Sequence, residues 1–513
     1  MRGFARFVVA TGVLLAGGCE VGPNYSRPHV SLPGEFSPAT RPSEQAQAAN
    51  LGTWWQTFHD PTLNRLVARG IAVNYDVQLA EARVLQARAQ VRYVRGGLFP
   101  DLAASGTYQR ITGSNTLSNA SVTNSRGSSG SSGSSNSSSS SGRVSSGTVF
   151  TSGTTNYYQA GFDAAWELDV FGATRRQIES AQASLQAQIE ARRDALVTLI
   201  SEVANDYVLL RGYQRELKIA RDNAEAQEHT LGLERELQGV GLDTGLTIAE
   251  EQAQVASTES AIPPLRTSVE QMVEALSVLL NEPAPQLRKE LGEMGPVPMG
   301  PARIPPGLPA DLLRRRPDVR EAERNLAAAT ANIGAATALW FPQFSLTGSL
   351  GLESTSLRKL VDRSSIFDAA GPSVSWDIFD AGELQAYIDV QNALQKQALV
   401  QYRQAVMQSL ADVNNALTAF YSEQDHRRLL QTEVAANQRS VALSQKLYKA
   451  GLVDFLTVLT AQQALYQSED QLQQSEQTVS TDLIALYKAL GGGWEGSEKS
   501  AVTAADASLG SGE

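Results

Sequence analysis

Cys19 is the residue of this sequence whose surroundings most clearly predict a chemical modification, and it is the only cysteine. Two arginines precede the apolar run Phe7–Leu15, and small residues at 16–18 lead into the cysteine. A basic start, a short apolar core and small residues before a cleavage site are typical of a secretory signal. We therefore predict that residues 1–18 are a lipoprotein signal peptide and that Cys19 carries acyl chains. The alternative is a plain secretory signal beside an unrelated cysteine.

Glu20, and not Asp, follows that cysteine. In lipoprotein sorting, the absence of Asp at this position favours the outer membrane. Several acyl chains together hold a protein stably at a membrane surface. We therefore expect a chain that is anchored by lipid to the outer membrane.

No other set of side chains has the spacing of a catalytic or metal site. A single cysteine excludes a disulfide framework and a cysteine-based metal centre. The formal net charge of −11 argues against a nucleic-acid partner. We expect no enzyme activity, no cofactor and no bound metal. The four histidines are scattered along the chain: His29, His59, His229 and His426.

Alternating apolar and polar residues predict four β-strands. A period of two places apolar side chains on one face of a strand and polar ones on the other. Strands of about ten residues with this pattern are typical of membrane-spanning barrels. An ordinary half-buried sheet is the alternative for any one of them. The predicted apolar positions are Leu102, Ala104, Gly106 and Tyr108; Tyr158, Ala160, Phe162, Ala164 and Trp166; Phe344, Leu346, Gly348, Leu350 and Leu352; and Val374, Trp376 and Ile378.

Four strands in one chain are too few to span a lipid bilayer alone. An open sheet in lipid leaves unpaired backbone groups at two edges, at a cost of several kcal/mol each. About eight strands are the smallest number that closes into a barrel. The chain is therefore expected to pool its strands with copies of itself.

A very long helical tract follows each pair of strands. Ala173–Leu237 and Glu383–Ala450 contain no proline, and at 1.5 Å per residue each would be roughly 100 Å long. Each tract turns at glycine and returns, as Leu246–Leu280 and Phe455–Leu490. The sequence thus predicts two long helical hairpins. Apolar residues that step by threes and fours predict a narrow packing seam, at Leu196, Leu199, Val203, Tyr207 and Leu210 and at Leu410, Val413, Leu417 and Phe420.

Matching motifs in the two halves predict an internal duplication. Phe99-Pro100 corresponds to Phe341-Pro342, and Gly241-Leu242 corresponds to Gly451-Leu452. A period this long is that of two duplicated halves and not of a solenoid. We assign residues 19–280 to a first repeat and residues 310–490 to a second.

Three segments fall outside this repeated pattern. The Ser/Gly-rich run 114–152 cannot bury enough apolar surface to fold, and its place between two strands predicts an extracellular loop. The proline-rich segment 281–309 predicts a surface linker without helical periodicity. Residues 491–513 predict a disordered tail.

Three motifs resemble those of the TolC-like outer-membrane efflux proteins, in their lipoprotein branch that serves drug-efflux pumps. Cys19–Pro28 is similar to the opening of that family, and Trp54–Leu66 to its first helical motif. The longest match is Gly307–Leu352, which reads GLPADLLRRRPDVREAERNLAAATANIGAATALWFPQFSLTGSLGL. The resemblance extends over nearly the whole chain, from Cys19 to Leu490.

The resemblance implies a mainly α-helical chain with a small transmembrane β-barrel. Three protomers would complete a twelve-stranded barrel in the outer membrane of a Gram-negative bacterium, and their helical hairpins would form a periplasmic tunnel. The homotrimer would be the exit duct of a tripartite efflux system, with a periplasmic adaptor and an inner-membrane RND-type, proton-driven pump. The duct of a type I protein secretion system and a non-channel coiled-coil stalk remain as alternatives.

The resemblance also suggests roles for residues at the hairpin turns. Similar turns meet the adaptor end to end, which would make Gly241, Leu242, Gly451 and Leu452 contact residues. Glycine at a helix end is also a common helix stop, and that alternative stays open. Family members narrow the tunnel just after the second turn, often with aspartates. The corresponding residues here are Asp454, Thr457 and Thr460, so that two of the expected acids are hydroxyls.

Overall fold

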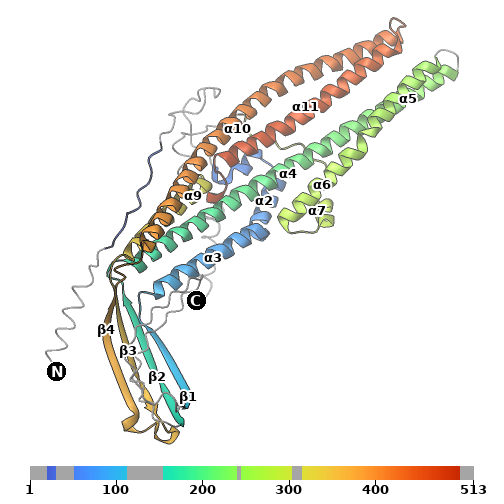
Figure 1. Cartoon of the computed structure of the whole chain (residues 1–513). Coiled ribbons are helices and arrows are strands. Elements are labelled where there is room, and N and C mark those ends of the chain that lie inside the picture. Colours follow the sequence, from blue (N-terminus) through green and yellow to red (C-terminus); the bar gives the residue numbers. More distant parts are fainter. Residues whose placement is uncertain (1–19, 31–50, 113–153, 240–243, 303–314, 497–513) are drawn as a thin grey trace, which may run out of the picture. The chain divides into compact units, whose positions relative to one another are not determined.

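A computed structural model of the chain describes residues 20–30, 51–112, 154–239, 244–302 and 315–496 (Figure 1). The chain divides into two compact units that alternate along the sequence. The sheet unit contains Ala89–Gln182, Ala327–Gln395 and the N-terminal residues up to Tyr25. The helical unit contains the remaining residues, 26–88, 183–326 and 396–513. Each compact unit therefore draws on both sequence repeats.

The sheet unit contains one antiparallel sheet of four strands in the order β1-β2-β3-β4. The strands are β1 (Asp101–Thr112), β2 (Thr154–Leu168), β3 (Gln343–Ser354) and β4 (Ile366–Ser375). Three of the four predicted strands are found where the alternation placed them. The predicted combination of a small sheet with very long helices is confirmed.

The prediction placed the fourth strand too late in the sequence. Strand β4 ends at Ser375, so Trp376 and Ile378 lie beyond it, although Val374 belongs to it as expected. Gly371 and Pro372 obscured the pattern, because both residues are disfavoured inside strands. Proline is tolerated at the edge of a sheet when its nitrogen points away from the neighbouring strand. Strand β4 is such an edge strand.

Long helices account for most of the remaining described residues. The two longest are α4 (Ala173–Gly239) and α10 (Glu383–Lys449), each of 67 residues. None of the described helices combines the length and the apolar character that a membrane-spanning helix needs. Three further long helices are α3 (Tyr75–Gly96), α9 (Pro317–Ala338) and α11 (Phe455–Ala489).

The returning arm of the first hairpin is broken, which differs from the single helix predicted over Leu246–Leu280. It consists of α5 (Gly245–Ser260) and α6 (Ile262–Leu280), which meet at Ala261. Pro263 and Pro264 follow this point. Because they have no N–H, the helical hydrogen bonds to the carbonyls of residues 259 and 260 cannot form. The two prolines therefore explain the break.

Two segments predicted to lack structure are partly ordered. A short helix, α7 (Ala284–Leu291), lies within the predicted linker and buries Leu287 and Leu291. The tail begins with an ordered stretch, in which the buried Trp494 ring lies 4.5 Å from the Arg193 guanidinium carbon. The linker segment places Ala284, Leu287, Leu291 and Val297 in the core, and the described part of the tail places Trp494 there. Residues 497–513 and the predicted loop 114–152 lie outside the described part of the chain.

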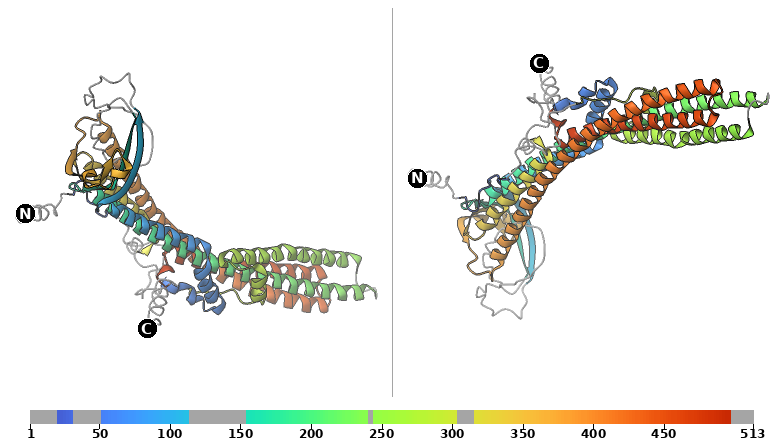
Figure 2. Two further views of the ribbon diagram at one scale, coloured as in Figure 1. Left: turned by 90° about the horizontal axis from the view of Figure 1, so that it is seen from below. Right: turned by 90° about the horizontal axis from the view of Figure 1, so that it is seen from above.

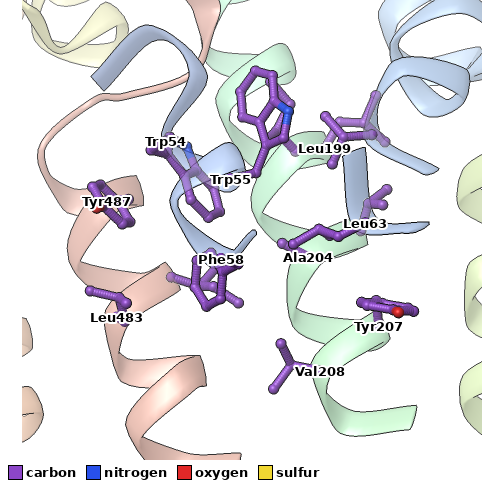
Figure 3. Close-up of a cluster of buried hydrophobic side chains, with 14 of the residues drawn as sticks. Trp54, Trp55, Phe58, Leu63, Leu199, Ala204, Tyr207, Val208, Leu483 and Tyr487 are labelled. Atoms are coloured by element: carbon purple, nitrogen blue, oxygen red, sulfur yellow. The ribbon is translucent and has the colours of Figure 1, made fainter. Parts of the chain in front are cut away.

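The core of the helical unit joins its long helices to an aromatic cluster near the N-terminus (Figure 3). The 3-10 segment η2 (Leu51–Phe58) supplies Trp54, which is fully buried and stacks on Tyr487 of α11 with 4.9 Å between ring centroids. Burying such a side chain contributes about 2–3 kcal/mol. The next helix is α2 (Pro61–Val73). All nine residues of the predicted seams are buried, and all belong to this core: Leu196, Leu199, Val203, Tyr207, Leu210, Leu410, Val413, Leu417 and Phe420.

The two hairpins lie side by side within the helical unit, as both views in Figure 2 show for α4, α5, α10 and α11. Polar side chains join them. The Tyr448 hydroxyl of α10 donates to Glu234 of α4 at 3.2 Å. Gln463 of α11 donates to Gln254 of α5. The four helices therefore form one packed assembly.

Candidate functional site

The four-stranded sheet has one apolar face and one polar face. The register aligns Ala104, Phe162 and Leu350 across the first three strands, with Asp368 beside them on β4. Large side chains on the apolar face are strongly exposed, among them Leu102 at 68% and Phe162 at 57%. Exposed apolar area on this scale marks a surface that is covered in use. On strands of this length, lipid is a fitting cover.

The opposite face of the sheet carries hydrogen-bonded polar side chains. Ser105 donates to Asp163 at 3.1 Å, and the Tyr157 hydroxyl donates to Glu353 at 2.8 Å. Serine hydroxyls of β3 and β4 lie 2.7 Å apart. In transmembrane barrels lipid-facing and lumen-facing residues alternate, and the lumen is polar. This face has the composition of a channel lining.

Both edges of the sheet are open within the described chain. Strand β1 pairs only with β2, and β4 pairs only with β3. Each edge therefore presents backbone N–H and C=O groups that could accept a further strand. The arrangement is suited to joining sheets from several copies.

In each half of the chain, a tryptophan near the end of the second strand donates a hydrogen bond to the turn between the preceding helix and the first strand. The indole of Trp166 in β2 donates to the carbonyl of Leu98 at 3.0 Å. The indole of Trp376, just after β4, donates to the carbonyl of Trp340 at 3.1 Å. Both acceptors lie two residues before a proline, so the bond recurs at matching positions. The sequence contained this signal, but neither indole was predicted to be a structural donor.

The second hairpin turn has the geometry of a helix stop. Gly451 has a φ of 69°, in the left-handed region that favours glycine. Its N–H donates to the Tyr448 carbonyl at 2.8 Å, and the N–H of Leu452 donates to that of Leu447 at 3.0 Å. This pair of bonds is the Schellman motif. It explains the glycine but not Leu452, whose side chain is 71% exposed.

The three residues predicted at the tunnel constriction share one exposed face at the start of α11. Asp454 is the N-cap, and its carboxylate accepts the N–H of Thr457 at 3.0 Å and the hydroxyl of Thr457 at 2.6 Å. These bonds lower the pKa of Asp454, and the bond from the Thr457 hydroxyl has the largest effect. The Thr460 hydroxyl donates to the Leu456 carbonyl at 2.6 Å. Asp454 is therefore ionised at neutral pH, and its side chain is held in place by the hydrogen bonds of the N-cap.

Other predicted site residues lie outside the described part of the chain. These are Cys19 and the first-turn residues Gly241 and Leu242. The first described residue after the first hairpin turn is Thr244. Its hydroxyl oxygen accepts the N–H of Thr247 at 3.4 Å and so caps α5.

Buried acids are functional candidates that the sequence did not reveal. Burial raises the pKa of Glu251 to about 7, and burial together with the charge of Asp470 raises that of Glu216 to about 7. No helical pattern distinguishes these glutamates from exposed ones. Among the described residues, no group of three or more His, Cys, Asp or Glu could hold a metal ion.

Comparison with known proteins agrees with these features. The model of the outer membrane efflux protein family matches residues 69–282 and 308–492. The probable efflux pump outer membrane protein TtgC of Pseudomonas putida is 30% identical over 493 residues, which cover 95% of each chain. The probable outer membrane lipoprotein SilC of Salmonella typhimurium is 28% identical over 491 residues, 95% of this chain and 98% of SilC.

A solved structure shows the same fold. The outer-membrane channel OprN has 31% sequence identity and a TM-score of 0.81, over 93% of this chain and 100% of OprN. The two-sided sheet with open edges, the long hairpins and the family match over most of the chain lead to one assignment. The chain belongs to the outer membrane efflux protein family.

Proposed function

We propose that this chain is the outer-membrane channel of a tripartite efflux system, in which it passes small molecules from an RND-type, proton-driven pump and a periplasmic adaptor to the outside. The observation that carries the proposal is the sheet, with an exposed apolar face, a polar face and two open edges. Such a sheet is stable in lipid only within a closed barrel. The chain supplies the passage and the pump supplies the energy, with no covalent chemistry.

Conductance tests the channel. The purified protein in a planar bilayer is expected to give discrete current steps, since a polar lumen conducts ions. A protein that inserts into the bilayer without conducting would instead support the alternative of a non-channel coiled-coil stalk. The efflux names of TtgC and of the matching family favour efflux over protein secretion. Deletion of the gene should therefore raise the accumulation of a small dye in cells and leave protein secretion unchanged.

A homotrimer is part of the same proposal. A four-stranded sheet needs further copies to close a barrel, and the resemblance to the efflux proteins implies three copies, which supply twelve strands. The mass of the detergent-extracted protein should be that of three chains. A stable monomer that conducts would contradict this arrangement.

A lipid anchor at Cys19 is part of the same proposal, and SilC, a probable lipoprotein, supports it. Cys19→Ser should abolish labelling with radioactive palmitate, because no other thiol exists in the chain. Labelling that persists in this variant would contradict the anchor.

Leu242 and Leu452 are proposed adaptor contacts, together with Gly241 and Gly451 beside them. The exposure of Leu452 supports this, because its hairpin leaves the side chain uncovered. Leu242→Asp combined with Leu452→Asp should leave the oligomer in the membrane and abolish cross-linking to the adaptor. The exposed Leu443 of α10, changed to Asp, is a matched control that should keep the cross-link. Normal cross-linking in the double variant would mean that both turns only end their helices and do not contact the adaptor.

Asp454, Thr457 and Thr460 are proposed to line the narrow periplasmic end of the channel. Their shared exposed face supports this. Thr460→Asp adds a carboxylate at each protomer and should increase the block of single-channel current by divalent cations, since rings of carboxylates bind cations. Thr460→Asn is the control of similar size. An unchanged block would mean that Thr460 does not line the constriction.

A further inference from the structure

The segment that follows Cys19 is bound to the start of α4 by a buried arginine. Only 3% of the Arg176 side chain is exposed. Its Nε donates to the Val21 carbonyl at 3.1 Å, and a terminal nitrogen donates to the Asn24 side chain at 2.7 Å and to the Gly22 carbonyl at 3.4 Å. The Glu20 carboxylate lies 3.6 Å from Nε. Four contacts of one side chain thus hold the segment Glu20–Asn24.

A second contact needs the absence of side chains. Gly22 lies against Gly334 of α9, and a Cβ on Gly22 would be 2.4 Å from the Gly334 Cα. Gly22 also has a φ of 90°, which L side chains rarely adopt. A Cβ on Gly334 would be 2.7 Å from Nε of Arg176. Both glycines are therefore required for the segment and the arginine to fit together.

The segment is also bound to the point where the chain leaves the sheet. The Val21 N–H donates to the carbonyl of Phe171, three residues beyond the end of β2, at 3.3 Å. Phe171 stacks on Phe341 with 4.6 Å between ring centroids. Aromatic girdles mark the level of the membrane surface in transmembrane barrels. The segment is thus bound beside an aromatic pair of the kind that such girdles contain.

Without the segment, Arg176 would lose most of its partners. Of the contacts described, only the bond to Glu179 at 2.6 Å comes from its own helix. A buried guanidinium with unpaired donors is strongly unfavourable. The site is thus complete only when the segment occupies it.

We propose that Arg176 and Gly334 form a docking site for the segment after the lipidated cysteine, and that docking determines where the anchor enters the membrane. This rests on the proposed lipidation of Cys19. Consecutive Cα atoms are about 3.8 Å apart, so the residue that would carry the lipid is attached one peptide unit from the docked Glu20. The lipid chains then enter the bilayer next to the sheet of their own protomer.

Hydrogen exchange of the Val21 amide in the lipidated protein, reconstituted in phospholipid nanodiscs, tests the proposal. In the wild type this amide should be protected by its bond to Phe171. Gly22→Val should raise its exchange rate at least about tenfold, because the segment can no longer approach α9. This variant leaves Arg176 and both helices intact. Arg176→Ala and Gly334→Ala should have the same effect from the other side of the site.

Amides in the core of the helical unit serve as an internal reference, and should keep their wild-type protection in every variant. Gly232→Ala is the matched control for Gly334→Ala, since a Cβ at Gly232 meets no atom within 4 Å. It should leave the Val21 amide protected. Unchanged protection in Gly22→Val would overturn the docking site.

The acyl mass of the N-terminal peptide is read from the same digests. An acylated wild-type peptide whose Val21 amide exchanges freely would contradict docking and leave the lipid anchor standing. A protected peptide without acyl chains would contradict the anchor, and with it the role of docking in placing the lipid.

Discussion

The two helical hairpins follow the same plan, but their returning arms differ. In the second repeat, α11 runs unbroken from Phe455 to Ala489. In the first, the corresponding arm is divided at Ala261 into α5 and α6. The N-caps differ too, because Asp454 caps α11 and Thr244 caps α5. The two hairpins therefore share one core although only the second has a continuous returning arm.

This difference indicates which interactions stabilise the returning arms. The broken arm still buries Val273, Leu276 and Leu280 in the main core. Most helical stability in proteins comes from packing of an apolar face and not from the backbone alone. A kink is tolerated where it leaves that face in place. The same kink within α11 would fall between residues that are buried on several sides.

Introducing a proline into α11 should have the largest effect. Gln474 is exposed and occupies the position in the second repeat that Pro264 occupies in the first. Gln474→Pro removes a helical hydrogen bond and clashes with the preceding turn, at a cost of about 3 kcal/mol or more. Unfolding followed by the helical circular dichroism signal should therefore have its midpoint at a lower guanidinium concentration. Gln474→Ala, which loses only the side-chain bond to Asp470, is the control. Equal midpoints would show that both arms tolerate a break.

The pH dependence of stability should report a buried acid in the first hairpin. Glu251 in α5 is fully buried, and neither carboxylate oxygen has a hydrogen-bond partner among the described residues. Burial raises its pKa from 4.5 to about 7. The folded protein therefore keeps a proton that the unfolded chain releases, so stability should fall as pH rises from about 4.5 through about 7.

Glu251→Gln should remove this part of the pH dependence. The variant should gain most at and above pH 7, by as much as roughly 3 kcal/mol, at 1.36 kcal/mol per pKa unit. Near pH 4 it should match the wild type. Unfolding midpoints at several pH values measure the effect. A gain that is the same at pH 4 and pH 8 would show that Glu251 is not neutral in the folded state.

Removing the break from the first hairpin should have a smaller effect. Pro263→Ala with Pro264→Ala restores two N–H groups that can donate to the carbonyls of residues 259 and 260. The unfolded chain also gains freedom when proline is lost, so the net change should be within about 1 kcal/mol. Slower hydrogen exchange around Ala261 would report the continuous helix. Unchanged exchange there would mean that packing, and not proline, causes the break.

Exchanging the caps should have the smallest effect. Thr244→Asp provides a carboxylate for the N–H of Thr247, and aspartate is the better N-cap by a few tenths of a kcal/mol. The first turn should become slightly more stable, as measured by the exchange of the α5 amides. For α11, Asp454→Asn keeps the cap and removes the charge, while Asp454→Ala removes both. Faster α11 exchange in the alanine variant alone would assign the stabilising effect to the cap.

Much of the architecture could be predicted from the sequence, because its determinants are local. The period of two in Phe344–Leu352 and the steps of three and four in Leu196–Leu210 are set by backbone geometry, and the structure confirms both. The prolines at 263 and 264 and the spacing of Leu287 and Leu291 are local signals too, and they mark the break and the short helix α7. The fourth strand was misplaced because Gly371 and Pro372 oppose the strand pattern within a strand.

The functional details depended on contacts between distant segments. Arg176 resembles the other arginines of α4 in sequence, and only the fold places the carbonyls of Val21 and Gly22 against it. Glu251 is one of several glutamates in its hairpin, and burial by neighbouring helices raises its pKa. Periodicity and turn chemistry are properties of the chain itself and determine helices and strands. Burial and hydrogen-bond partners arise only when distant segments pack, so the tertiary structure alone decided which charges are held in the interior.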